Sequence, residues 1–400
     1  MSSGLSSARL SRMHATLAAY VEHGELPGLV TLLARRGEVH VDTLGAQAIG
    51  GEAMRRDTIF RISSMTKPIT AVAAMVLVEE CKLRLDDPVD RLLPELANRR
   101  VLQQIDAPLD DTVPAKRPIS LRDLLTSRMG FGSVMATPGT YPIQRALSDY
   151  QLGGDGLPQP AQMPSADEWM RRLGSMPLMH QPGERWLYNT AFDVLGVLIA
   201  RATGQPFAAF LRERIFEPLG MRDTGFSVPA DKLGRLATSY EADAETGALQ
   251  LYDTAAGGQW SSPPPFESGA GGLVSTVDDY LAFCRMLLNK GKLDSTRILS
   301  RPAVELMISD QVTLEQRTGA EIFFRDSSSW GFGMAVYTRR DDLMAGPGRF
   351  GWDGGLGSSA YSDPAEDLVG ILLTQCAWTS PSGPQIWNDF WTSAYAAIDD

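Results

Sequence analysis

The chain has 400 residues, of which 44% are hydrophobic and 21% charged, a composition typical of a globular protein with a sizeable core. A formal net charge of -11, without any lysine- or arginine-rich block, argues against a nucleic-acid partner, because such partners require many phosphate contacts. Residues 1–23 contain no signal-peptide core, and no run approaches the roughly 20 apolar residues of a membrane-spanning helix. We therefore expect a cytoplasmic protein without membrane segments.

The N-terminal part of the chain predicts a helix, a hairpin and a buried helix, in that order. Apolar residues at helical spacing predict a helix over residues 8–23, which Gly24 ends. Residues 28–45 form two runs rich in valine, leucine and threonine around Arg36-Gly37, which predict a β-hairpin. The alanine-rich apolar run ITAVAAMVLVEECKL predicts a buried helix that begins near Ser64.

The rest of the chain divides into a helical part and a second strand-rich part. Residues 86–267 show short helical patterns separated by stretches rich in proline and glycine. After them, Thr276 precedes a helical run. Strands are predicted by WGFGMAVYTRR, by the apolar run near FGWDGG and by DLVGILLTQ, and a closing helix is predicted by PQIWNDFWTSAYAAI. The pattern predicts a single α+β domain over residues 1–400, with an antiparallel sheet flanked by helices. The sheet lobe would contain residues 1–85 and 268–400, residues 86–267 would form an inserted, mainly helical lobe, and the cleft would lie between the lobes.

Ser64 and Lys67 have the spacing of a nucleophile and its base. Residues at i and i+3 of a helix share a face, so the lysine amine can reach the serine oxygen. A serine at a helix N-terminus also has free backbone N–H groups nearby, which favour an oxyanion. Lys67 must be neutral to act as a base, and burial in the apolar helix would lower its pKa. The short SxxK pattern alone also arises by chance beside a capping serine.

The sequence around this pattern resembles a known superfamily. SSMTKPITAVAAMVLVEECKLRLDDPV resembles the nucleophile helix of serine beta-lactamases and penicillin-binding proteins, whose motif begins with S-x-x-K. The resemblance continues in PISLRDLLTSRMGFG at 118–132, in PGERW before Tyr188 and in GAGGLVSTVDDYLAF at 269–283. It covers about residues 28–398 and is nearest to the beta-lactamase-like carboxylesterases of family VIII, which are similar to class C beta-lactamases and DD-peptidases in fold.

The resemblance implies that Tyr188 begins the second motif. That motif reads Y-x-N or Y-x-x in the family, and here it reads Tyr188-Asn189-Thr190, without asparagine at the third place. By analogy, the Tyr188 phenol would carry protons together with Lys67. A core aromatic before an apolar helix is the alternative interpretation of Tyr188. Asp193 would cap or pair within that helix.

The third motif departs from the lactamases. Where they carry K-T-G, this chain has Trp352-Asp353-Gly354, and esterases of the family commonly show W-x-G. These three residues are the predicted substrate-binding residues, and an indole in place of a cation favours a neutral substrate. By analogy, the backbone N–H groups of Ser64 and Gly355 would form the oxyanion hole. A glycine-rich strand turn is the structural alternative.

Other catalytic devices are not found in the sequence. There is no G-x-S-x-G elbow, P-loop, HExxH or GxGxxG before a helix, and His14, His23, His40 and His180 lie in no triad context. Cys81, Cys284 and Cys376 have no CxxC or Cys/His ligand spacing, so neither a disulfide framework nor a metal or other cofactor is predicted. Four tryptophans are interpreted as packing residues without a catalytic role, namely Trp169, Trp186, Trp260 and Trp330.

The function predicted from these motifs is hydrolysis of a small-molecule ester or amide. We expect Ser64 to form an acyl-enzyme from a short-chain carboxylic ester, and water to release the acid. Because an acyl-enzyme does not specify its acceptor, the alternatives are a beta-lactamase, a D-amino-acid peptidase or amidase, and an acyltransferase. A further alternative, from a different class, is a catalytically silent binding protein of the same fold.

Overall fold

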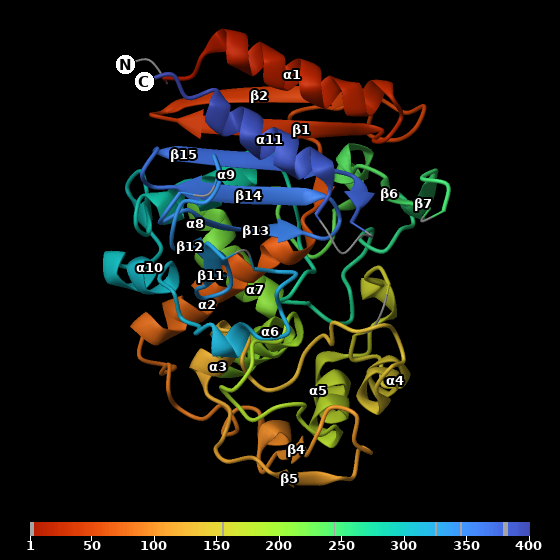
Figure 1. The fold of residues 1–400 in the computed structure, drawn as a ribbon, viewed down its shortest axis with the longest axis vertical. Helices are drawn as coiled ribbons and strands as arrows, with labels where there is room; N and C mark the ends of the chain where they lie inside the picture. Colours follow the sequence, from red (N-terminus) through yellow and green to blue (C-terminus); the bar gives the residue numbers. More distant parts are fainter. Residues whose placement is uncertain (1–3, 154–155, 244, 325, 345, 379–382) are drawn as a thin grey trace.

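The computed structural model describes residues 4–153, 156–243, 245–324, 326–344, 346–378 and 383–400. Its centre is a seven-stranded antiparallel sheet with the strand order β11-β12-β13-β14-β15-β1-β2 (Figure 1). The strands of this sheet are β1 (Gly28–Arg35), β2 (Glu38–Gly45), β11 (Ser328–Trp330), β12 (Ala335–Tyr337), β13 (Phe350–Gly354), β14 (Ser358–Asp363) and β15 (Leu368–Thr374). Both ends of the sequence therefore build one sheet, because β1 pairs with β15.

Helices cover both faces of the sheet. Those of the described residues are α1 (Ser7–Glu22), α2 (Thr66–Glu79), α3 (Leu121–Leu125), α4 (Pro142–Asp149), α5 (Ala166–Ser175), α6 (Thr190–Thr203), α7 (Phe207–Leu211), α8 (Glu217–Leu219), α9 (Val277–Leu288), α10 (Arg301–Met307) and α11 (Gln385–Ala396). Helices α1 and α11 pack together on the face seen in Figure 1, whereas α9 packs behind it against β1, β14 and β15. Helices α2 and α6 pack against each other below the sheet in that view.

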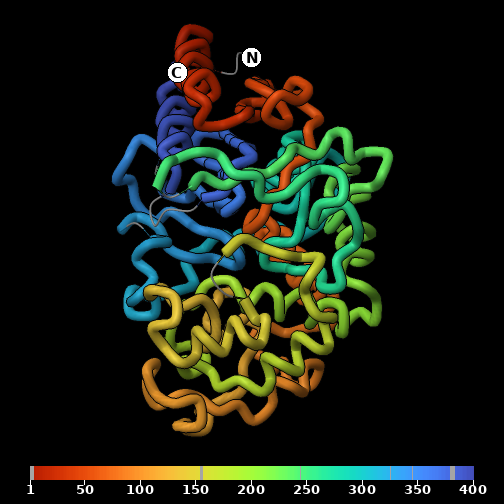
Figure 2. Tube along the Cα trace, turned by 90° about the vertical axis from the view of Figure 1, so that its right-hand side faces the viewer, coloured from red at the N-terminus to blue at the C-terminus, as the bar shows by residue number. Residues whose placement is uncertain are grey.

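Short strands form small sheets around this centre. They are β3 (Phe60–Arg61) with β8 (Val274–Ser275), β4 (Arg100–Leu102) with β5 (Thr112–Pro114), β9 (Lys292–Leu293) with β10 (Thr296–Arg297), and β6 (Ser239–Ala242) with β7 (Leu249–Asp253) and β16 (Cys376–Ala377). Strand β6 pairs in parallel with β16, which follows β15. This part of the range predicted as a helical lobe therefore lies beside the sheet. Figure 2 shows the part of this range that is coloured orange to yellow-green at the opposite end from the chain termini, whereas α6 packs against α2 and α8 against α9.

The predicted hairpin forms because its turn has the required backbone. Arg36 and Gly37 have φ values of 51° and 84°, and two-residue hairpin turns of type I′ need positive φ at both central positions. Every residue of β1 is buried, since β2 and β15 flank it, α9 packs on one face, and α1 and α11 pack on the neighbouring strands β2 and β15. The N-terminal helix and the closing helix also lie where the sequence predicts them.

Two predicted elements differ in detail from the structure. The WGFGMAVYTRR run contains two short strands, β11 and β12, because the chain turns between Trp330 and Ala335, where Gly333 has a φ of 79°. The buried helix α2 begins at Thr66, and Ser64 lies in a 3-10 turn over Ser63–Met65. Ser63 has a φ of 45°, which prevents a regular α-helix from including it.

The interior between the sheet, α2 and α6 is apolar. All residues of α2 from Thr66 to Leu77 are buried, including Lys67. Within the described ranges no single helix is long and apolar enough to cross a membrane. The helix α6 and the following Phe207–Leu219 segment have sufficient length and apolar character only when taken together, and they are bent by 81° relative to each other. Most of α6 is buried as a core helix of the protein.

Candidate active site

The turn that carries Ser64 is fixed by hydrogen bonds from three directions. Strand β3, just before it, pairs with β8. Thr66 Oγ1 donates to the carbonyl of Ser63 at 2.7 Å, and Tyr280 OH donates to the carbonyl of Met65 at 2.9 Å. Ser64 is 8% exposed and its side chain lines the cleft described below. The hydroxyl is thus held at the N-terminal end of α2 while it stays accessible to a small molecule.

Lys67 lies at the centre of a group of oxygen atoms. Its Nζ is 2.9 Å from Ser64 Oγ, 2.8 Å from Asn189 Oδ1, 2.7 Å from the carbonyl oxygen of Ala270 and 3.3 Å from Tyr188 OH. The Asn189 and Ala270 oxygens can only accept hydrogen bonds. They therefore take two N–H groups of a neutral amine and leave its lone pair for a hydroxyl of Ser64 or Tyr188.

Burial sets the charge state of these groups. The Lys67 side chain is inaccessible to solvent, and this burial lowers its pKa to about 7, against the opposing effect of the Asp193 carboxylate. Burial raises the pKa of Tyr188 to about 12, and hydrogen bonds with Ser64 and Trp352 oppose the shift. At neutral pH a neutral Lys67 is therefore available, whereas the Tyr188 phenolate is scarce.

Asn189 supplies an amide to the site from the second place of its motif. The family pattern has its asparagine at the third place, which Thr190 occupies here, and Thr190 is buried at the start of α6. Asn189 has a φ of 80°, in the left-handed region, and this conformation accompanies the 2.8 Å contact of its side chain with Lys67. The sequence motif assigns no role to Asn189. The positive φ of Asn189 cannot be predicted from the sequence, so its contact with Lys67 could not be predicted either.

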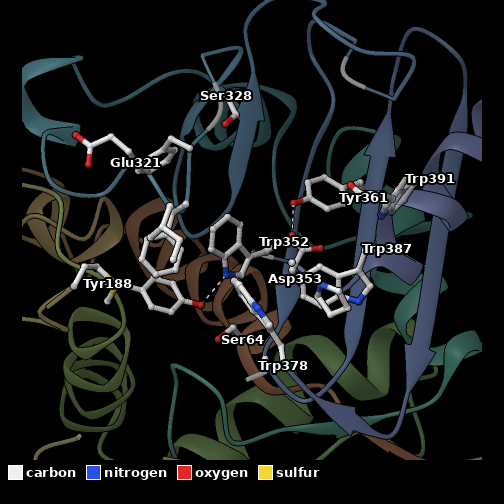
Figure 3. A pocket seen from close by; sticks show the side chains of 18 of the residues that line it. Ser64, Tyr188, Glu321, Ser328, Trp352, Asp353, Tyr361, Trp378, Trp387 and Trp391 are labelled. Carbon is white, nitrogen blue, oxygen red and sulfur yellow. Dashed lines mark hydrogen bonds between the residues drawn. The ribbon is translucent and has the colours of Figure 1, made fainter. Parts of the chain in front are cut away.

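Trp352 and Asp353 lie on opposite faces of β13. Figure 3 shows the Trp352 indole directed at Tyr188, whose oxygen accepts from Nε1 at 2.9 Å. Asp353 is directed the other way, and its carboxylate accepts from Ser359 Oγ at 2.5 Å and from Tyr361 OH at 2.9 Å. Both residues line the cleft, because β12 pairs only with the first part of β13 and leaves the rest as an edge.

The two glycines after Asp353 have different surroundings. A Cβ on Gly354 would lie 2.4 Å from the carbonyl oxygen of Ile62, so Gly354 packs against the turn before Ser64 and does not line the cleft. Gly355 lines the cleft with Ser64, and a Cβ there would meet nothing closer than Ser63 Oγ at 3.9 Å. Among the described residues, neither the Ser64 nor the Gly355 amide donates to a backbone carbonyl.

These residues share one large cleft of about 1320 Å³. Its apolar lining comes from the loop after α3, from the segment before β11, from the residue after β16 and from α11. The main apolar side chains are Val134, Met135, Ile322, Phe323, Phe324, Trp378, Trp387 and Trp391. In the part of the chain that the structure describes, no three histidine, cysteine or acidic side chains gather as metal ligands.

The tryptophans interpreted as packing residues are all buried, and two of them support the site. Trp186 stacks on Tyr188 with ring centroids 5.6 Å apart, and Trp330 meets Trp352 edge-on at 4.7 Å. Trp169 packs against Phe266. The aromatic layer behind Tyr188 and Trp352 restricts the orientations that these two rings can take.

Comparison with known proteins decides the family. The family model named Beta-lactamase matches residues 13–387. This chain belongs to the beta-lactamase family. The family assignment and the fold class confirm the resemblance seen in the sequence.

Relatives of this beta-lactamase-family protein include enzymes that act on esters. It is 39% identical to Protein Rv1367c of Mycobacterium tuberculosis, over 90% of this chain and 88% of that protein. It is 33% identical to Esterase EstB of Burkholderia gladioli, over 94% of this chain and 92% of that protein. The solved structure of EstCE1, described as a hydrolase with promiscuous acyltransferase activity, superimposes with a TM-score of 0.77 at 25% identity, covering 97% of this chain and 99% of EstCE1.

One residue of the beta-lactamase-family site has a different partner from the one expected. The sequence predicts that Asp193 caps or pairs within its own helix. Instead its Oδ1 accepts from Ser268 Oγ at 2.6 Å and from the Ala270 amide at 3.2 Å, both in the segment that carries a carbonyl partner of Lys67. The helix start of α6 faces that segment, so the nearest donors come from a distant part of the sequence. A single sequence does not reveal such a pairing.

Proposed function

We propose that this protein is a serine hydrolase that cleaves short-chain carboxylic esters through an acyl-enzyme on Ser64. The observation that carries the proposal is the 2.9 Å distance between Lys67 Nζ and Ser64 Oγ in a site where the lysine is fully buried. A serine hydroxyl becomes a nucleophile only beside a base that removes its proton. The esterase name of EstB and the hydrolase description of EstCE1 support this choice among the chemistries of the family.

The first half-reaction uses Lys67 as the base. Ser64 Oγ attacks the ester carbonyl carbon while its proton passes to the neutral Lys67 amine. The oxyanion that forms would be bound by the amides of Ser64 and Gly355. When the carbonyl re-forms, the alkoxide leaves with the proton of Tyr188 OH, and the Lys67 ammonium, 3.3 Å away, returns a proton to the phenol. The pKa of about 7 for Lys67 and about 12 for Tyr188 support this order of proton transfer.

The second half-reaction repeats these transfers with water. A water molecule in the position of the departed alcohol gives a proton to the same pair and attacks the acyl carbon, and Ser64 leaves as a hydroxyl. Asn189 and the Ala270 carbonyl keep two lysine N–H groups occupied throughout, so that the lone pair stays directed at the reacting hydroxyls. This arrangement also makes a catalytically silent binding protein the less favoured interpretation.

The residues of the third motif support a neutral substrate. Trp352 places an indole where lactamases carry a lysine, and its N–H is already used by Tyr188. A substrate carboxylate would find no lysine cation at this position. We therefore expect penicillins, cephalosporins and D-amino-acid peptides to be poorer substrates than neutral esters.

Acyl transfer to an alcohol is the second candidate. The cleft volume of about 1320 Å³ exceeds the ~300 to 1,000 Å³ common for small-molecule pockets, so an acceptor alcohol fits beside an acyl group. The promiscuous acyltransferase activity of EstCE1 supports the same possibility. Hydrolysis and transfer share the acyl-enzyme and differ only in the acceptor.

The test combines active-site labelling with a matched pair of variants. A fluorophosphonate should form a single adduct on Ser64, located by mass spectrometry, and butyrate esters should be hydrolysed. Ser64→Ala should lower kcat by ~10⁴ to 10⁶. Ser63→Ala, which changes the neighbouring buried serine, is the control and should keep most activity. An adduct on another residue, or an active Ser64→Ala variant, would contradict the proposal. Adding a primary alcohol and measuring ester product against free acid decides between transfer and hydrolysis.

A further inference from the structure

The peptide group between Ala270 and Gly271 connects Lys67 to the carboxylate of Asp193. Its carbonyl oxygen, on Ala270, lies 2.7 Å from Lys67 Nζ. Its N–H, on Gly271, donates to Ser268 Oγ at 3.1 Å. Ser268 Oγ in turn donates to Asp193 Oδ1 at 2.6 Å. The hydrogen bonds therefore run in one direction, from the lysine amine to the carboxylate.

Further contacts hold this segment in place. The Ala270 N–H donates to the same Asp193 Oδ1 at 3.2 Å. Thr70 Oγ1, on α2, donates to the carbonyl of Gly269 at 2.8 Å. A Cβ on Gly269 would lie 2.4 Å from the carbonyl oxygen of Phe192, on α6, so only glycine permits this approach. The segment is therefore fixed between the two helices that carry Lys67 and Asp193.

The direction of these hydrogen bonds favours a positive charge on Lys67. The dipole of the 270–271 peptide points its oxygen at the amine and its N–H toward the carboxylate side, so each bond polarises the next one. A lysine without solvent access has no water to stabilise an ammonium. The free energy of that ammonium therefore depends on the groups around it. Burial lowers the pKa of Lys67 and the Asp193 carboxylate opposes this shift, whereas burial raises the pKa of Asp193 against the opposing effects of the Ser268 hydrogen bond and the Lys67 charge.

We propose that Asp193 is a positioning residue, which holds the 270–271 peptide against Lys67 and stabilises the ammonium that forms when Lys67 takes the proton of Ser64. This inference rests on the proposed function, because it requires Lys67 to be the base. No hydrogen bond joins Asp193 to Ser64 or Tyr188 among the described residues, so it acts through the peptide. It plays the part of the third, orienting group of a catalytic triad, with a peptide and a serine hydroxyl placed in between.

Few other titratable groups face Lys67. Tyr188 approaches from the loop before α6, and Asp193 approaches from α6 itself. Asp353, on the opposite face of β13 from Trp352, carries a charge that raises the pKa of Tyr188. On α2, the remaining charged side chain is Glu79, at the opposite end of the helix. A change in the titration of Lys67 can therefore be assigned to Asp193 by a single substitution.

The test is the pH dependence of Ser64 labelling by a fluorophosphonate, followed together with kcat/KM for a butyrate ester. Asp193→Asn removes the charge and keeps the size of the side chain. The pKa of Lys67 should then fall, so the midpoint of the acidic limb should move to lower pH by about one unit. The plateau rate should fall roughly tenfold to a hundredfold, because the weaker base accepts the proton less well. Ser268→Ala should shift the midpoint in the same direction by a smaller amount.

The control is Glu267→Gln. The Glu267 carboxylate accepts from the Ala208 amide at 2.8 Å and so anchors the same segment to α7. This variant should leave the midpoint unchanged. An Asp193→Asn enzyme that loses rate equally at every pH, with an unmoved midpoint, would show a merely structural role and overturn the proposal. If Asp193→Asn does not fold, an unmoved midpoint in Ser268→Ala does the same. A wild-type enzyme that is not labelled at Ser64 would instead refute the proposed function.

Discussion

The indole N–H of Trp352 donates a hydrogen bond of 2.9 Å to the phenol oxygen of Tyr188. A donor at this oxygen stabilises the phenolate and lowers the pKa of Tyr188, which burial raises. The residue in the place of the lactamase lysine therefore acts on the proposed proton carrier as well as on the substrate site. The hydrogen bond between Trp352 and Tyr188 depends on the three-dimensional structure and cannot be predicted from the sequence of the third motif.

Trp352→Phe should reduce kcat/KM for a butyrate ester about threefold to tenfold, in line with ~0.5 to 1.5 kcal/mol for one hydrogen bond. An aromatic ring is kept, but the smaller phenyl group removes the donor to Tyr188 together with part of the packing of the buried indole. Trp387→Phe is the matched control, because that indole lines the same cleft and its N–H has no hydrogen-bond partner among the described residues. Equal losses in the two variants would show that shape, and not the hydrogen bond, matters.

Lys67→Met and Tyr188→Phe should each lower kcat by several orders of magnitude, yet the double variant should resemble the worse single one. Both residues serve one proton transfer, so removing the second after the first has little left to remove. Steady-state kinetics on the three variants measures the coupling. Losses that multiply would mean that the two groups act independently.

The wild-type kcat/KM should rise with pH through a midpoint near 7. Below the pKa of about 7, Lys67 is an ammonium without a lone pair, so it cannot accept the Ser64 proton. No fall should follow at pH 8 to 10, because the pKa of Tyr188 is about 12 and its proton remains in place. A profile that is flat from pH 5 to 9 would argue against Lys67 as the base.

Gly354→Ala and Gly355→Ala should differ sharply in stability. The added methyl at Gly354 would overlap the carbonyl oxygen of Ile62, and overpacking of this kind typically costs ~1 to 3 kcal/mol in unfolding free energy. The methyl at Gly355 meets its nearest atom at 3.9 Å, so that variant should unfold near the wild-type temperature. Thermal unfolding followed by circular dichroism compares them, and a destabilised Gly355→Ala with a normal Gly354→Ala would contradict the packing described above.

A butyrate ester should have a far higher kcat/KM than a chromogenic cephalosporin on the same preparation, with Ser64→Ala as the blank. The cephalosporin carboxylate finds an indole at position 352, and Trp352→Lys should narrow the difference by supplying a cation. A cephalosporin value equal to the ester value or above it would indicate a lactamase.

Much of the fold follows from local patterns in the sequence. The N-terminal helix, the β1–β2 hairpin, α2 and the closing helix form where periodicity and turn residues predict them, because each depends on neighbours in the chain. Strand β14 was not predicted. Its sequence, SSAYSD, is mostly small and polar apart from Tyr361, yet every residue is buried, since β13 and β15 flank it and α9 packs on it. Tertiary packing decides such a strand, and propensity does not.

The site divides in the same way. Ser64 and Lys67 lie three positions apart at the start of one helix, so their spacing alone indicates contact. The backbone of Asn189 is in the left-handed region, and its side chain contacts Lys67. The distant segment 268–271 contributes the Ala270 carbonyl that contacts Lys67 and the Ser268 hydroxyl that contacts Asp193. The Ala270 contribution comes from a carbonyl, which every residue has, so no residue type marks it.

Side chains on β13 point alternately to the two faces of the sheet, so the site depends on the exact number of residues in this strand. Trp352 faces Tyr188 and Asp353 faces Tyr361 because Trp352 pairs with Ala360 and Asp353 with Ser359. A slip of one residue between β13 and β14 would exchange the two faces. The carboxylate would then meet the phenol that must stay protonated, and the indole would lie under α11. Point substitutions can tune positions 352 and 353, whereas an insertion or deletion inside this strand would exchange an acid and a hydrogen-bond donor in a single step.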